Sequence, residues 1–277
     1  MILVTGATGN IGRELVRQLH ADGATPLRAL TRDPARARFP TGVVAVEGDL
    51  ASAESLKPAL EGAHALFLIS GAGAEAGIIE TARQAGVRHV VLVSSIAVET
   101  HPHLPASGQN LAVEQALRDS GLDWTILRPT QFASNTLWWA AEIREHRTVH
   151  APFGDIGLPA VHPADIAAVA RVALTRPGHE GRTYPLTGPE RVTPREQVAA
   201  IAAALGEPVT LVDISREEAQ QRMARYLGAE TAAAVLDLMG GDVNDGVLAV
   251  RDTVPRVTGV PARFFREWAE EHVAAFR

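Results

Sequence analysis

The sequence predicts an α/β protein with a doubly wound parallel sheet and a small, mostly helical C-terminal lobe. Short, continuous apolar runs alternate with helical stretches over about the first 129 residues. Such runs are typical of parallel strands that are buried on both faces. Several helical stretches end in a glycine that can take the left-handed conformation, among them Gly23, Gly86 and Gly121. This alternation favours right-handed crossovers between neighbouring strands.

The core elements are expected in strict order along the chain. Strands are expected over residues 1–5, 25–31, 43–47, 65–69, 89–94 and 124–127, and helices over 11–21, 53–60, 75–85 and 110–119. A helix over 164–174 and a strand over 183–186 indicate a later return to this core.

The C-terminal part has a different pattern. Thr193-Pro-Arg-Glu196 has the residues of a helix N-terminus, and 217–239 is a further helical region. We therefore expect a core over residues 1–129, rejoined by about 160–188. A capping lobe is expected over 130–159 and 189–277, interleaved with the core in one compact unit.

Composition and charge narrow the class of protein. The chain of 277 residues has no cysteine, which excludes disulfides, thiolate metal sites and a cysteine nucleophile. Its formal net charge is -6, and its acidic and basic residues are mixed, so no basic face for nucleic acid is expected. No apolar window reaches the ~18–20 residues of a membrane span, and the N-terminus does not resemble a signal peptide. We expect a cytoplasmic monomer or homodimer that binds a small molecule.

The first strand runs into Gly6-Ala-Thr8-Gly9-Asn10-Ile11-Gly12 and then into a helix. Gly6 permits the tight turn, Gly9 lets a pyrophosphate approach the backbone, and Gly12 lets the helix pack closely on the strand. A glycine-rich turn with no ligand is the alternative. Because the motif lies at the first strand–helix junction of an αβ alternation, it predicts a dinucleotide-binding Rossmann fold.

The side chain about 20 residues beyond the last glycine usually selects between NAD and NADP. Here it is Arg32, whose guanidinium favours the 2′-phosphate of NADP, and Arg36 and Arg38 could assist. Ordinary solvated arginines are the alternative, and the adjacent Asp33 keeps NAD open. The expected cofactor is NADP(H), with NAD(H) as the second choice.

Other cofactor contacts are expected where later strands end, because these carboxyl ends line the ligand crevice of an open sheet. Asp49 and Leu50 follow the third strand, and the Asp49 carboxylate could bond the adenine amino group. Ser70 and Gly71 follow the fourth strand, and Ser94 follows the fifth.

Seven segments resemble the NmrA-like group of atypical short-chain dehydrogenases/reductases. They read GATGNIG, GDL, HVVLVSS, EQALRDSGLDWTILRPTQF, VHPADIAAVA, YPLTGPE and TGVPARFFREW, and the similarity covers nearly the whole chain. The resemblance implies a quinone-oxidoreductase-like, NAD(P)H-binding protein. The group holds NAD(P)H-dependent quinone and azo reductases, and also proteins that bind the dinucleotide as a signal and catalyse nothing.

One feature of the wider superfamily is missing. Typical members use a tyrosine as the proton donor and a lysine four residues later. The tyrosine position falls at Ala106 and the lysine position at Asn110, whose amide could still bond a ribose. The two tyrosines of the chain, Tyr184 and Tyr226, are not followed by a lysine at that spacing.

Candidates for the remaining chemistry lie after the fifth and sixth strands. Proton transfer or orientation could involve Ser94, Ser95, His101, His103 or Gln131, although each histidine could equally be a surface loop residue. The resemblance places Phe132 beside the nicotinamide. Acceptor contacts are expected from Asn135 and from the flat faces of Trp138 and Trp139, which could instead only pack the lobe. No metal site is expected.

Three functions remain open. The first is hydride transfer from NADPH to a small quinone-like, enone or carbonyl acceptor, because such an acceptor can take its proton from water. The second is a non-catalytic NADP(H)-binding regulator that acts through a protein partner. The third is a reductase of a specific natural-product intermediate with another proton donor.

Overall fold

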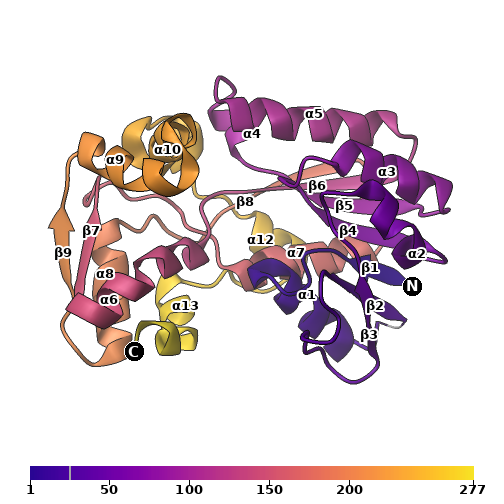
Figure 1. Ribbon diagram of the computed structural model, residues 1–277, viewed down its shortest axis with the longest axis horizontal. Helices are drawn as coiled ribbons and strands as arrows, with labels where there is room; N and C mark the ends of the chain where they lie inside the picture. Colours follow the sequence, from indigo (N-terminus) through magenta and orange to yellow (C-terminus); the bar gives the residue numbers. More distant parts are fainter. Residues whose placement is uncertain (25) are drawn as a thin grey trace.

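A parallel seven-stranded sheet forms the centre of the molecule, in the order β3-β2-β1-β4-β5-β6-β8 (Figure 1). The computed structural model describes residues 1–24 and 26–277. The strands are β1 (Ile2–Val4), β2 (Leu27–Thr31), β3 (Val43–Glu47), β4 (Ala65–Ile69), β5 (His89–Val93), β6 (Asp123–Pro129) and β8 (Arg182–Leu186). The chain runs outward from β1 to β3 and then crosses to β4, so the strand order reverses between β1 and β4. The predicted doubly wound sheet is confirmed.

Helices cover both faces of this sheet (Figure 1). On one face pack α1 (Asn10–Ala21), α7 (Pro163–Thr175) and α12 (Thr253–Thr258). On the other pack η1 (Ala53–Leu56), α2 (Lys57–Leu60), α3 (Glu75–Gln84) and α5 (Pro105–Asp119). Each face of the sheet has its own hydrophobic core, and successive residues of β1 point into different ones. Val4 lies in the same core as Leu15 of α1, and Leu3 lies in the same core as Ile78 of α3. Both faces are therefore buried, which explains the continuous apolar runs of the sequence.

The expected core elements lie close to the observed ones, with three differences in their bounds or type. The helix expected from residue 110 begins at Pro105, because proline fits the first turn of a helix. The helix expected over 53–60 is a 3₁₀ turn, η1, followed by α2. Of the strand expected over 25–31, β2 covers Leu27–Thr31, and Thr25 lies outside the described residues.

A second group of elements has a small sheet of its own, in which β7 (Thr148–Ala151) pairs in parallel with β9 (Thr210–Asp213). Its helices are η2 (Ala133–Trp139), α6 (Ala140–His146), α8 (Pro194–Leu205), α9 (Arg216–Leu227), α10 (Ala229–Leu236), η3 (Asp237–Gly241), α11 (Asp245–Leu248), α13 (Phe265–Glu271) and η4 (Val273–Phe276). Figure 1 shows this group beside the large sheet, and α11 of this group contacts α4 (Ala97–Thr100).

Local sequence signals explain parts of this second group. Thr193 caps α8 as expected, because its Oγ1 accepts a hydrogen bond from the Glu196 amide at 3.1 Å. The helical region over 217–239 is broken at Gly228, whose φ of +80° ends α9.

Trp268 of α13 is fully buried in the core of the group. No helix in the described residues is both long and apolar enough to cross a membrane.

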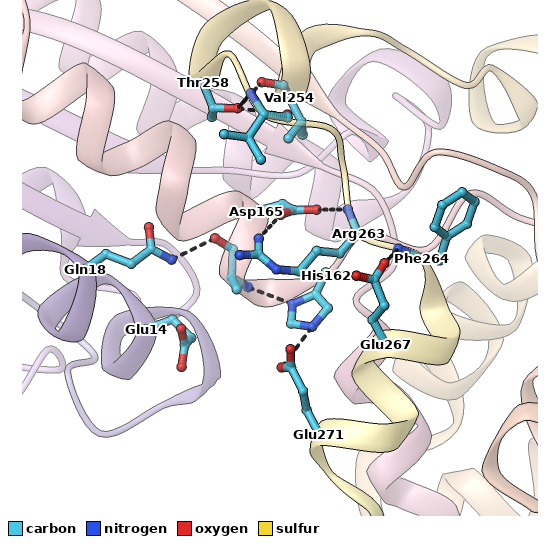
Figure 2. Close-up of polar contacts among 12 residues, drawn as sticks. Glu14, Gln18, His162, Asp165, Val254, Thr258, Arg263, Phe264, Glu267 and Glu271 are labelled. Atoms are coloured by element: carbon cyan, nitrogen blue, oxygen red, sulfur yellow. Dashed lines mark hydrogen bonds and ion pairs between the residues drawn. The ribbon is translucent and has the colours of Figure 1, made fainter. Parts of the chain in front are cut away.

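The start of α7 holds the C-terminal segment against the large sheet (Figure 2). The Asp165 carboxylate accepts a hydrogen bond from the Arg263 amide at 2.7 Å and pairs with the Arg263 guanidinium. His162 is the N-cap of α7, and its Nδ1 accepts from the Ala164 amide at 3.0 Å. His162 Nε2 lies 3.3 Å from Glu271 Oε2, outside good hydrogen-bond geometry. Asp165 therefore anchors the C-terminal segment to the start of α7.

Candidate cofactor and acceptor site

The glycine loop between β1 and α1 has the geometry of an anion-binding turn. Gly6 has a φ of +57°, which glycine adopts without strain. A Cβ on Gly12 would lie 2.2 Å from the Gly6 carbonyl oxygen, so glycine is needed for α1 to start this close to the loop. Gly9 is exposed, and a Cβ there would meet within the protein only the same oxygen, at 3.2 Å.

The N-terminus of α1 is open to an anion. Gly9 is the N-cap, no side chain caps the first turn, and this turn holds no acidic residue. The amides of Asn10, Ile11 and Gly12 have no intrahelical partner, and Thr8 is exposed beside them. These amides and the positive end of the helix dipole fit the diphosphate of a dinucleotide. The loop residues expected from the sequence thus surround one suitable position, and their contacts with the cofactor stay predictions.

The loop after β2 presents arginines. Arg32 and Arg36 are exposed, and neither forms an ion pair among the described residues. The Asp33 Oδ1 atom accepts hydrogen bonds from the Ala35 and Arg36 amides at 3.1 and 3.2 Å, so this carboxylate stabilises its own turn. Arg38 Nη1 donates to the carbonyls of Ala35 and Ala37, both at 3.2 Å. The loop therefore offers positive charge, which fits a 2′-phosphate better than a bare ribose.

The ends of β3 and β4 are built from tight turns. The exposed Asp49 uses Oδ1 to accept from the Ala51 amide at 3.0 Å, next to Leu50. Ser70 Oγ lies 2.8 Å from the Val93 carbonyl oxygen and 2.7 Å from Asn110 Oδ1. The Gly71 amide already donates to the buried Glu75 carboxylate at 2.6 Å. A cofactor contact at these positions would have to use other atoms, and these assignments stay predictions.

A cavity of about 280 Å³ lies where the ends of β5 and β6 meet the second group of elements. The structure brings to it seven residues expected from the sequence, namely Ser94, Ser95, Gln131, Phe132, Asn135, Trp138 and Trp139. Val235 of α10 and Leu238 and Met239 of η3 line it from the other side. We call residues 216–241 (α9, α10 and η3) the cap segment. Gln131 Nε2 donates to the Leu238 carbonyl at 2.6 Å and so holds the cap segment over the cavity.

His101 and His103 do not line this cavity. His101 is fully buried, its Nε2 donates to the Asp242 carbonyl at 2.8 Å, and its Nδ1 lies 2.8 Å from Thr100 Oγ1. The exposed His103 has its Nε2 3.6 Å from the Asp242 carboxylate. The structure therefore places His101 as a link between the loop after α4 and the residues that follow η3, and its catalytic role stays an untested prediction.

Sequence reasoning missed the buried carboxylate behind Ser94. Ser94 Oγ donates to Glu114 Oε1 at 2.7 Å, and Arg128 donates from Nε at 2.9 Å and from Nη2 at 2.6 Å to the two oxygens of the same carboxylate. Burial raises the pKa of Glu114, but the hydrogen bonds from Arg128 and Ser94 and the charges of Arg128 and Arg118 outweigh it and lower this pKa. The signal was an arginine inside the apolar strand WTILRP, since a buried charge needs a partner.

The cavity contains no side chain that titrates. None of its lining residues in the described chain is Asp, Glu, His, Lys, Arg or Tyr. Tyr184 Oη lies 2.9 Å from His179 Nδ1, and Tyr226 is 88% exposed on α9. The single lysine of the sequence, Lys57, lies on α2. The cavity thus has no replacement for the missing tyrosine and lysine.

Residues 6–177 match a protein-family model that is described as NAD(P)H-binding. The chain belongs to the NAD(P)H-binding family. The matched residues include the glycine loop, the arginine loop after β2 and the strand ends that line the cavity. The family therefore agrees with the fit of the α1 N-terminus to a dinucleotide.

Relatives with a named activity are similar over the whole chain. A (4-alkanoyl-5-oxo-2,5-dihydrofuran-3-yl)methyl phosphate reductase from Streptomyces griseus is 42% identical, over 100% of this chain and 99% of that protein. An NAD(P)H azoreductase from Xenophilus azovorans is 39% identical, over 100% of this chain and 99% of that protein. The crystal structure of an NADPH-dependent quinone oxidoreductase from Escherichia coli, complexed with NADPH, has a TM-score of 0.82 and 27% identity, over 98% of this chain and 99% of that chain.

These similarities confirm the NmrA-like resemblance and the class of NAD(P)H-dependent reductase. At the level of the family they also confirm the nicotinamide cofactor, with NADP(H) preferred and NAD(H) as the second choice. The reductase relatives act on small molecules. The oligomeric state, the lack of a nucleic-acid role, the cytoplasmic location and the division into core and capping lobe stay predictions.

Proposed function

We propose that this protein transfers hydride from NADPH to a small, uncharged acceptor whose double bonds are conjugated, such as a quinone or an enone. The observation that carries the proposal is the cavity of about 280 Å³ at the strand ends, lined without any ionisable side chain. Residues 130–159 and 189–277 would act as the substrate lobe, because they supply most of the lining.

The residues of the site would bind and orient. The α1 amides hold the diphosphate, and Arg32 pairs with the 2′-phosphate. The bound dinucleotide supplies a hydride. Phe132, Trp138 and Trp139 hold a flat acceptor against this end of the site, and close orientation alone supplies much of the acceleration.

The lack of an acid restricts the acceptor. When hydride adds to a carbon of the acceptor, the electron pair of the broken double bond moves to an oxygen, which must later take a proton. A conjugated acceptor delocalises this negative charge, so its oxygen can be protonated by water after the hydride has been transferred. A simple ketone would instead form a strongly basic alkoxide, which needs an acid at the moment of transfer. Gln131 and Asn135 offer amide N–H donors toward such an oxygen, without donating a proton.

The charge of the acceptor is restricted as well. No arginine or lysine lines the cavity among the described residues. Arg128 and Arg195, each next in sequence to a lining residue, pair with Glu114 and with Asp155 and Asp213, while the exposed Arg191 donates to the Leu248 carbonyl at 2.7 Å. An anionic acceptor would therefore enter an apolar cavity without a free cation, at a high desolvation cost. This weighs against the phosphorylated substrate named for the Streptomyces relative.

Steady-state oxidation of NADPH by a panel of acceptors tests the proposal. The panel holds a neutral quinone, a neutral enone, a simple ketone, and a phosphorylated and a dephosphorylated form of one butenolide. We expect turnover with the quinone or the enone, none with the ketone, and faster turnover with the dephosphorylated butenolide. Tight NADPH binding without turnover on any acceptor would instead favour the non-catalytic regulator. Selective turnover of the phosphorylated butenolide would favour the natural-product reductase.

A further inference from the structure

We propose that Ser94 serves this site as a hydrogen-bond acceptor for the carboxamide N–H₂ group of the nicotinamide, and that Glu114 fixes it in that role. The proposal rests on the proposed function for the presence of a nicotinamide end at this cavity. The sequence suggested both cofactor binding and proton transfer for Ser94. The proposal assigns it cofactor binding.

The hydroxyl proton of Ser94 is already committed. Ser94 Oγ lies 2.7 Å from Glu114 Oε1, and both residues are buried. A carboxylate only accepts hydrogen bonds, so the proton of this contact must come from the serine. Glu114 is ionised, because Arg128 binds both of its oxygens and Arg118 Nη2 donates to Oε2 at 3.0 Å. A serine held in this way cannot give a proton to an acceptor.

The lone pairs of Ser94 Oγ are therefore what this side chain can offer to a ligand. Ser94 lines the cavity, and no donor among the described residues binds this oxygen. The neighbouring hydroxyl differs, since Ser95 Oγ already accepts from the Ala97 amide at 3.1 Å. A buried acceptor with free lone pairs beside a ligand cavity calls for an N–H or O–H group on the ligand.

The position of Ser94 selects the nicotinamide as the source of this group. Ser94 follows β5, two strands from β1, on the side of the sheet opposite to β2 and Arg32. A dinucleotide with its 2′-phosphate at Arg32 and its diphosphate at α1 must direct its other end toward β4 and β5. That end carries two kinds of donor, the carboxamide N–H₂ and the ribose hydroxyls, whereas the conjugated acceptors proposed above carry no N–H. We assign the carboxamide to Ser94, because Asn110 is the residue expected to bond the ribose.

The test is a binding experiment with two cofactors that differ in this one group. The reduced 3-acetylpyridine analogue of NADP has a methyl group where NADPH has the carboxamide NH₂. We expect Ser94→Ala to raise the Kd of NADPH about tenfold, the value of one hydrogen bond to a buried group. The Kd of the analogue should change by less than about twofold, because it has no N–H to lose. Ser120→Ala is the control, because Ser120 lies at the end of α5, outside the lining of the cavity, and its Oγ donates to the Leu117 carbonyl at 2.7 Å. It should leave both values unchanged.

Two results would overturn the proposal, namely an equal loss with both cofactors and no loss with either. Both Kd values come from quenching of tryptophan fluorescence and need no acceptor, so this outcome is separate from whether any acceptor is reduced. A thermal melt of Ser94→Ala without cofactor identifies a folding defect. If the variant is unstable, Ser94→Cys, whose thiol is a weak acceptor, should give the same selective loss for NADPH.

Discussion

Gly9 and Gly12 lie three residues apart and answer different needs. A Cβ on Gly12 would collide with backbone at 2.2 Å, whereas a Cβ on Gly9 would mainly enter the space where we place the diphosphate. We expect Gly12→Ala to lower the free energy of unfolding by about 2 kcal/mol or more. Gly9→Ala should keep nearly the wild-type melting temperature but raise the Kd of NADPH at least about tenfold. Melting curves and fluorescence titrations measure both effects, and wild-type NADPH affinity in Gly9→Ala would contradict the anion site.

Arg32 carries the prediction of NADP over NAD. Arg32→Ala should raise the Kd of NADPH about ten- to a hundredfold, since a charge-assisted contact to the 2′-phosphate is lost. The Kd of NADH should change by less than about threefold, because NADH has no phosphate there. Arg83→Ala, which removes an exposed arginine paired with Glu80 on α3, is the control. Equal weakening of the two cofactors would show that Arg32 does not contact the phosphate.

At this scale the sequence predicts positions well and contacts less well. The glycine spacing and Arg32 could be placed because they depend on local geometry and on distance along the chain. The partner of Ser94 could not be predicted, because the Glu114 carboxylate that accepts its hydrogen bond lies on another element, 20 residues away. The link from His101 to the Asp242 carbonyl spans 141 residues, and no local pattern encodes such a contact.

The cap segment is the element that closes the acceptor cavity. Arg216 at the start of α9 pairs with Asp237 in η3 at 2.7 Å and so holds the two ends of the segment together. We expect Arg216→Ala to raise the KM of the acceptor about threefold with little change in the Kd of NADPH, since a partly exposed ion pair contributes up to about 1 kcal/mol. Arg222→Ala, which breaks a pair with Glu218 within the same helix, is the control and should leave KM unchanged. An equal effect of both variants would mean that the Arg216 pair does not hold the cap segment.

The N-cap of α7 gives the protein an acid sensitivity. Burial, with added effects from the charges of Arg263 and His272, lowers the pKa of His162 to about 3 from 6.5. The folded state therefore keeps this imidazole neutral where the unfolded chain would protonate it. His162 thus contributes stability that is complete above about pH 6.5 and is lost as the pH falls toward about 3.

His162→Asn isolates this contribution. Asparagine also caps helices but does not titrate, so we expect a flatter stability curve over this pH range. Asp165, whose pKa is raised by burial against opposing contacts from Arg263, is present in both proteins, as is Glu271. His146→Asn, at an exposed position on α6, should match the wild type. Urea unfolding at a series of pH values measures the curves, and parallel curves for His162→Asn and wild type would refute this account.

Elements of the core could be read from the sequence because each strand is a continuous apolar run between turn residues. The strands of the small sheet could not be predicted from the sequence. Thr148–Ala151 and Thr210–Asp213 have four residues each, and they pair across some sixty residues of other elements. Thr148–Ala151 alternates polar and apolar residues, but four residues are too few to identify a strand, and no residue of Thr210–Asp213 is buried.

The acceptor site exists only at the scale of the whole molecule. The ends of β5 and β6 supply one wall, η2 supplies the aromatic side chains, and the cap segment supplies the roof. The sequence predicted the aromatic residues, but the absence of ionisable groups from the cavity follows from the meeting of all three parts. That absence leads to the central claim, that hydride moves to an uncharged conjugated acceptor without an acid from the protein.

The most direct test is a single-turnover measurement of NADPH oxidation by a neutral quinone, with enzyme and quinone saturating, followed at the reduced-nicotinamide absorbance. With no titrating group in the cavity, we expect the rate of hydride transfer to change by less than about twofold between about pH 7 and about pH 9. A rate that falls about tenfold for each pH unit would reveal an acid in the site. Bound NADPH that is never oxidised would contradict the claim entirely.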